Sequence, residues 1–135
     1  MVTREDLLEY VREEHERRGN NPDDKPIFSL FLFEHPDKEL IYDMKDGSKK
    51  PSGFPDTGGA YEPGFYYNLD YAIEAMNENA CDIRETCYNA GFILCRFAGM
   101  YECCGSYARM YFVWNDEKKG FFQQEEPDIF KHIAY

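Results

Sequence analysis

Two apolar segments constrain the fold of this chain more than any other feature of its sequence. Residues 27–33 read Ile-Phe-Ser-Leu-Phe-Leu-Phe, and residues 88–97 are similarly rich in apolar and aromatic side chains. Both have the length of a strand, and both lack the alternation of a strand with one face in water. They therefore predict two buried strands, the first of them central in a sheet. Gly91 in the second segment marks a place where a helix or loop approaches closely.

Two other stretches have the apolar periodicity of helices. Residues 4–18 follow a capping-box pattern at Thr3 and Asp6, and Gly19 ends the pattern. A second helix is expected from residue 69 to at least Asn79, with Asn68 as its N-cap and residues 80–86 as its continuation or a separate turn. The first apolar stripe consists of Leu7, Leu8, Val11 and His15; the second consists of Leu69, Ala72, Ile73, Met76 and Ala80.

The remaining segments complete a predicted α+β domain. Residues 39–44 are expected to return as a more polar partner strand of 27–33, and residues 107–114 and 121–124 as a hairpin. Pro127 suits the first turn of a short terminal helix through Ile133. The interpretation is a single domain over residues 1–135, with a mainly antiparallel sheet of about four to five strands, two main helices and a short C-terminal helix.

Net charge excludes one broad class of partner. The chain has 15 Lys plus Arg and 26 Asp plus Glu, so its formal charge is −11. Nucleic-acid-binding proteins neutralise phosphates with clustered cations, so direct nucleic-acid binding is not expected. Gly58-Gly59 is the nearest approach to a phosphate-binding loop, but it has no adjacent Lys and no helix directly after it. We expect neither a cofactor nor a membrane partner, and the charged N-terminus favours a cytoplasmic protein.

The cysteines and histidines give no catalytic or metal motif. All five cysteines lie between residues 81 and 104, and their spacing matches no zinc site. Cys103-Cys104, beside Gly105 in a predicted turn, is the pair that a thiol-dependent enzyme would use, and His15, His35 and His132 lie in no nucleophile motif. A thiol- or His-dependent enzyme is therefore the third of three hypotheses, and we predict no metal site.

Acidic and aromatic residues gather in one region. Residues 51–83 contain six acids and no base, which is more than half of the excess charge. Residues 45–67 are rich in Gly, Pro and aromatics and are predicted to form a long ordered loop. The acids of the following helix step by four residues, which places like charges in one strip facing solvent. The candidate binding residues are Tyr61, Glu62, Phe65, Tyr66, Tyr67, Asp70, Glu74 and Glu78.

These residues support a leading hypothesis and one main alternative. The leading hypothesis is a non-enzymatic binding protein whose acidic, aromatic surface occupies a basic site on a partner, such as a nuclease or another nucleic-acid-binding protein. In size and charge, though by no motif, the chain is similar to small acidic inhibitors from phages and mobile elements, including anti-CRISPR and toxin-immunity proteins. The alternative is a small-ligand-binding domain whose aromatic loop closes a pocket of Tyr61, Tyr66, Tyr67 and Trp114. The oligomeric state is left open.

Overall fold

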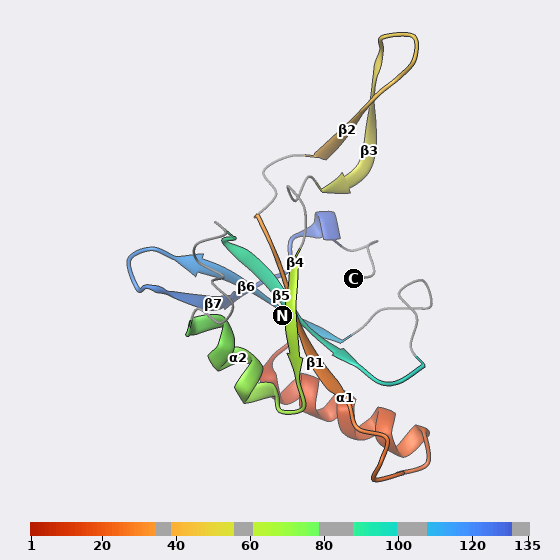
Figure 1. The fold of residues 1–135 in the computed structure, drawn as a ribbon, viewed down its shortest axis with the longest axis vertical. Coiled ribbons are helices and arrows are strands. Elements are labelled where there is room, and N and C mark those ends of the chain that lie inside the picture. Colours follow the sequence, from red (N-terminus) through yellow and green to blue (C-terminus); the bar gives the residue numbers. More distant parts are fainter. Residues whose placement is uncertain (35–38, 56–60, 79–87, 100–107, 131–135) are drawn as a thin grey trace.

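The fold is α+β, and its described residues form two α-helices and an antiparallel sheet of five strands (Figure 1). The structure is a computed structural model that describes residues 1–34, 39–55, 61–78, 88–99 and 108–130. In chain order the elements are α1 Arg4–Arg17, β1 Ile27–Phe33, β2 Glu39–Asp43, β3 Lys49–Pro55, β4 Tyr61–Tyr66, α2 Leu69–Asn77, β5 Ala90–Arg96, β6 Arg109–Asn115, β7 Gly120–Gln124 and a 3-10 turn at Asp128–Phe130.

The two apolar segments form inner strands of this sheet, as predicted. The strand order is β4-β1-β5-β6-β7, so β1 and β5 each have neighbours on both sides. They pair along their whole length, from Ile27 opposite Arg96 to Phe33 opposite Ala90. The predicted hairpin is also confirmed, because β6 and β7 pair directly through the turn after Asn115.

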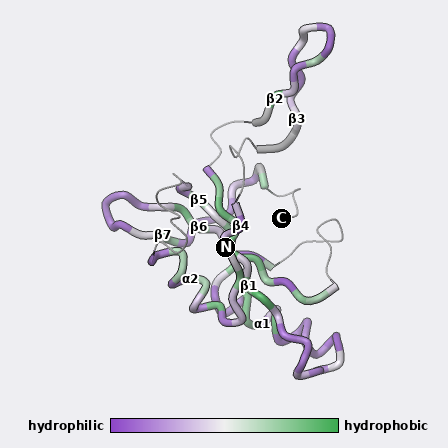
Figure 2. The backbone as a smooth tube through the Cα atoms, viewed as in Figure 1, coloured by the Kyte–Doolittle hydropathy of each residue, from purple (hydrophilic) through white to green (hydrophobic). Residues whose placement is uncertain are grey.

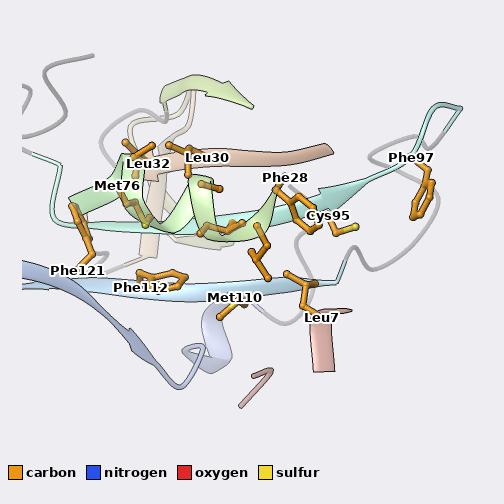
Figure 3. Close-up of a cluster of buried hydrophobic side chains, with 14 residues drawn as sticks. Leu7, Phe28, Leu30, Leu32, Met76, Cys95, Phe97, Met110, Phe112 and Phe121 are labelled. Atoms are coloured by element: carbon orange, nitrogen blue, oxygen red, sulfur yellow. The ribbon is translucent and has the colours of Figure 1, made fainter. Parts of the chain in front are cut away.

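Both helices pack on the same face of the sheet (Figure 3). Leu7 of α1 and Met76 of α2 meet side chains from β1, β5, β6 and β7 in one buried cluster. The close approach predicted at Gly91 is confirmed. A methyl group there would lie 2.6 Å from Leu32 Cδ2 and 3.0 Å from Met76 Cε. A side chain at this position would therefore push both the neighbouring strand and α2 outward.

The opposite face of the sheet has a second, aromatic core. Phe33, Phe92, Tyr111 and Phe130 pack with ring centroids 5.2–6.4 Å apart, and the Arg109 guanidinium lies 4.5 Å from the Phe92 centroid. Phe130 belongs to the 3-10 turn, and Arg109 donates a hydrogen bond to its carbonyl oxygen. This contact holds the end of the chain against the sheet.

The segment from β2 to β3 differs from the prediction. Residues 39–44 were expected to pair with β1, and residues 45–67 to form a loop; instead β2 pairs with β3 as a separate two-stranded arm. Figure 1 shows this arm, residues 39–55, projecting from one end of the molecule. The turn at its tip depends on Gly47, which has φ of +85°, and on Asp46, which accepts hydrogen bonds from Ser48. The tip is mostly hydrophilic (Figure 2).

The two helices and the last described residues differ in detail from the sequence-based predictions. The capping box of Thr3 and Asp6 is present, but Leu8 is exposed, while Tyr10 packs on the core and Glu14 is buried beside Arg17. Helix α2 ends at Asn77, two residues short of the expected minimum, and residues 80–86 lie outside the described ranges. Of the expected C-terminal helix, the described residues show only the 3-10 turn, since residues 131–135 lie outside them.

Candidate protein-binding surface

The predicted aromatic loop is in fact strand β4 at the edge of the sheet. Its pairing with β1 separates the aromatic side chains by face. Tyr66 is half-buried and packs against the helix-side core. Phe65 and Tyr67 are 56% and 69% exposed, and their rings meet edge to face with centroids 6.2 Å apart. Phe65 in the strand and Tyr67 directly after it thus form an exposed aromatic pair, and alternation along the strand places Phe65 on the face opposite to Tyr66.

Helix α2 continues this exposed surface directly after β4. The side chain of Asn68 caps the helix by accepting hydrogen bonds from the backbone N–H groups of Asp70 and Tyr71. Leu69, Ala72 and Met76 are buried, so the outer side of the helix presents Tyr71, Glu74 and Glu78 to solvent.

Tyr71 is a candidate that the sequence analysis missed. It is 61% exposed. Tyr71 lies three residues before Glu74 in the helix that the Asn68 cap begins, and this spacing, which places the two side chains on the same side of α2, is the signal that could have identified it.

Asp70 does not belong to an unpaired acidic strip. Arg4 Nε donates a hydrogen bond of 2.7 Å to Asp70 Oδ1, and Arg4 Nη2 donates one of 2.7 Å to Asp70 Oδ2. Hydrogen bonding from Arg4 lowers the pKa of Asp70 below its ordinary value. The pair joins the first turns of α1 and α2, so Asp70 stabilises the packing of the helices. The predicted strip therefore reduces to Glu74 and Glu78, for which the described residues contain no ion-pair partner.

Two other predicted residues also make internal contacts. Glu62 lies 3.3 Å from Arg96 of β5, reaching across β1. Tyr61 stacks on Tyr88 with ring centroids 5.8 Å apart. Both residues hold the edge strand in place. The exposed residues left to meet a partner lie along β4, the residue after it and α2, and we refer to them together as the acidic–aromatic surface: Phe65, Tyr67, Tyr71, Glu74 and Glu78.

A hollow of about 340 Å³ adjoins this surface at Tyr67. It is not the predicted aromatic pocket: Trp114 lies on β6, which two strands separate from β4, and it packs on Phe121 with centroids 5.3 Å apart. The lining instead combines apolar and charged residues, namely Asp23, Lys25, Ile27, Tyr67, Arg96, Phe97 and Ala98.

The described part of the chain contains no cluster of His, Cys, Asp and Glu that could hold a metal ion. Cys95 is buried in the core, and burial raises the pKa of its thiol to about 12, so it is not a nucleophile near neutral pH. His15 is half-buried, and its Nε2 lies 2.7 Å from the Asn21 carbonyl oxygen. Cys103, Cys104, His35 and His132 lie outside the described ranges.

Comparisons with protein-family models, with curated proteins and with solved structures give no match to this chain. Among the described residues, no helix has both the length and the apolar character needed to span a membrane.

Proposed function

We propose that the protein is a non-enzymatic, acidic binding module that acts in the cytoplasm by occupying a basic surface of another protein. A nuclease or other nucleic-acid-binding protein is the partner class that fits best, because its phosphate-binding groove is basic. A role as an inhibitor of the kind that phages and mobile elements direct against defence systems or toxins follows from the same size and charge.

The observation that carries this proposal is the exposure of three large aromatic side chains, Phe65, Tyr67 and Tyr71, in a stretch of chain that also exposes Glu74 and Glu78. Each ring is more than half exposed. Large aromatic side chains bury much area on binding and lose little rotamer entropy, which is why they are enriched among binding hot spots. Exposing three of them is unfavourable for the free protein and favourable once a partner covers them.

Charge supports the same partner class. Glu74 of α2 and Glu78, its C-cap residue, are four residues apart, and both are exposed. Like charges at this spacing repel by a few tenths of a kcal/mol. A cationic partner surface relieves that repulsion and accelerates the encounter with a chain of net charge −11.

The test is binding to a panel of purified basic nucleases and DNA-binding proteins, measured at several salt concentrations. We expect at least one panel member to bind, to bind more weakly as salt rises, and to be released by its own nucleic acid. The double variant Glu74→Lys with Glu78→Lys should lose binding, and so should Tyr71→Ala.

A matched variant controls for net charge alone. Glu13 and Glu117 are exposed and lie on α1 and in the β6–β7 turn, outside the residues of the acidic–aromatic surface. Reversing both to Lys changes the net charge by the same amount as reversing Glu74 and Glu78. Equal loss of binding in the two double variants, or no binding by any panel member, would contradict the proposal.

The hollow beside Tyr67 supports a second candidate function, the binding of a small molecule. Its mixture of apolar wall and charged groups is typical of ligand sites. A thermal-shift screen of metabolites tests it, since a ligand specific to the folded state raises the melting temperature. The shift should disappear in Tyr67→Ala, and a flat response across the screen would argue against this function.

A further inference from the structure

We propose that two copies of this chain form a dimer in which the β2–β3 arm of each copy docks on the acidic–aromatic surface of the other. This inference goes beyond the proposed function. It assigns a role to the arm, which that function does not use, and it implies that a basic partner competes with the second copy for the same surface.

The arm has the composition of a docking element. A two-stranded hairpin alone is marginally stable in water and usually packs its apolar side chains on something else. On this arm Ile41, Tyr42 and Met44 are 43–48% exposed. Ile41 and Tyr42 are neighbours on one strand and so point to opposite faces, which exposes apolar area on both sides.

The charge at the tip of the arm is opposite to that of the rest of the chain. Residues 45–50 contain three Lys and one Asp, which gives 3 − 1 = +2 in a chain of −11. Lys49 pairs with Asp43 at 2.7 Å, and both side chains are largely exposed. Lys45 and Lys50 are exposed as well. The tip therefore offers cations beside apolar side chains, which complements the acids and aromatic rings of the acidic–aromatic surface.

The shape of the molecule allows both contacts to form together. The arm lies at one end of the long axis, and the helices lie toward the other end (Figure 1). A two-fold axis perpendicular to this long axis would set two copies side by side and antiparallel, with each arm beside the other's α2. The interface is then isologous and closes as a dimer.

The edges of the sheet are less suited to self-association. Edge strand β4 carries Pro63, and its register with β1 shifts between Leu30 and Leu32, two features that oppose pairing with another strand. At the other edge, the backbone N–H of Phe121 on β7 already donates to Asn77 Oδ1 at 2.8 Å. Both edges are thus partly protected against strand pairing, and the proposed contact of the arm uses its side chains instead.

Charge reversal on each side of the interface provides the test, with sedimentation velocity over a wide range of concentrations as the measurement. We expect the wild type to show a concentration-dependent dimer that weakens with salt. Reversing Lys45 and Lys50 to Glu, or Glu74 and Glu78 to Lys, should raise the dimer dissociation constant by about tenfold or more, because both contacts then join like charges.

An equimolar mixture of the two variants is the decisive sample. In the mixed dimer, the acidic arm of the Lys45 and Lys50 variant meets the cationic α2 of the Glu74 and Glu78 variant. The unchanged cationic arm of the second variant meets the unchanged acidic α2 of the first. We expect the dimer to return in the mixture, which also shows that both variants are folded. The Glu13 and Glu117 double reversal should leave the wild-type dimer intact.

Two outcomes would overturn the dimer: a wild type that is monomeric at all concentrations, and a mixture of the two variants that stays monomeric. If the monomeric wild type also binds duplex DNA through Lys45 and Lys50, the cations of the arm serve nucleic acid instead of a second copy. The arm-reversed variant separates this inference from the proposed function, because it retains the acidic–aromatic surface. If it is monomeric and still binds a basic partner, both proposals hold; if the wild type is monomeric and binds that partner, only the dimer fails.

Discussion

The sheet and the arm are both antiparallel, yet different interactions hold them together. In β1 and β5 most side chains are buried, and the strands lie between a helix-covered core and an aromatic core. In the arm, the described side chains include none that is buried, and the turn at Gly47 and the ladder between β2 and β3 define the structure. Burial therefore specifies the sheet, whereas turn chemistry specifies the arm.

The largest effect is expected in the aromatic core. Phe92→Ala removes a ring that contacts Phe33, Tyr111 and Phe130 and lies under Arg109. We expect a loss of about 3–5 kcal/mol in the free energy of unfolding. Urea denaturation measures it, and Tyr42→Ala on the arm is the control, with an expected loss within about 0.5 kcal/mol. A similar loss in both variants would show that the arm is as tightly packed as the sheet.

A second variant tests packing between α2 and the sheet. Gly91→Ala introduces a methyl group 2.9 Å from the Phe31 carbonyl oxygen and 3.0 Å from Met76 Cε. Overpacking of this kind costs about 1–3 kcal/mol. Gly64→Ala in β4 is the matched control, because nothing lies within 4 Å of its added methyl group. Equal thermal stability of the two variants would mean that α2 does not press on β5.

Because the Cys95 thiol is buried, the stability of the sheet is expected to depend on pH in the alkaline range, and the exposed arm has no such buried group among its described side chains. Burial raises the pKa of Cys95 from an ordinary value of 9.0 to about 12 in the folded state. The corresponding stability is complete below pH 9.0 and is lost as pH rises toward 12, because the unfolded chain releases this proton first.

The slope is at most about 1.4 kcal/mol per pH unit for one group. Chemical denaturation of the wild type and of Cys95→Ala, both at increasing alkaline pH, measures it. The variant should lose less stability over the first unit above pH 9.0. Burial also raises the pKa of Tyr111, so both proteins weaken at higher pH. If the free energies of unfolding of the two proteins fell in parallel with pH throughout, Cys95 would ionise as readily in the folded protein as in the unfolded chain.

The smallest effect is expected at the tip of the arm. Gly47 has φ of +85°, a conformation that costs Ala about 1 kcal/mol. Gly47→Ala should speed amide hydrogen exchange in residues 41–51 and leave exchange in β1 and β5 unchanged. A lower melting temperature of the whole protein, or faster exchange throughout the sheet, would show that the arm and the sheet unfold as one unit. The two regions would then not differ in what stabilises them.

Much of the candidate surface was predictable, but its division into exposed and engaged residues was not. The stripe of α2 and its Asn68 cap identified the helix and the outward position of Glu74 and Glu78. The partner of Asp70 is Arg4, 66 residues away, and the partner of Glu62 is Arg96, 34 residues away. Sequence spacing on a single element contains no information about such long-range pairs.

Strand β2 was predicted with the wrong partner, and strands β3 and β4 were missed because Gly and Pro are frequent in them. Asp46-Gly47 is a turn signal, and it was present within the predicted loop. Pro51, Pro55 and Pro63 obscured the strands, since proline is tolerated only at edges and in strands with a free side. The arm and β4 are such strands: one stands apart from the sheet and the other lies at its edge.

The sequence by itself determined the helices, the buried strands β1 and β5, the β6–β7 hairpin and the α+β class, because each follows from periodicity and capping within one segment. Only the tertiary structure decided that β4 rather than β2 completes the sheet, that the arm stands apart, and that Glu74 and Glu78 stay exposed while Asp70 and Glu62 pair with distant arginines. The physical reason is that strand pairing and side-chain exposure depend on contacts between segments that are distant in the chain, where one-dimensional patterns give no constraint.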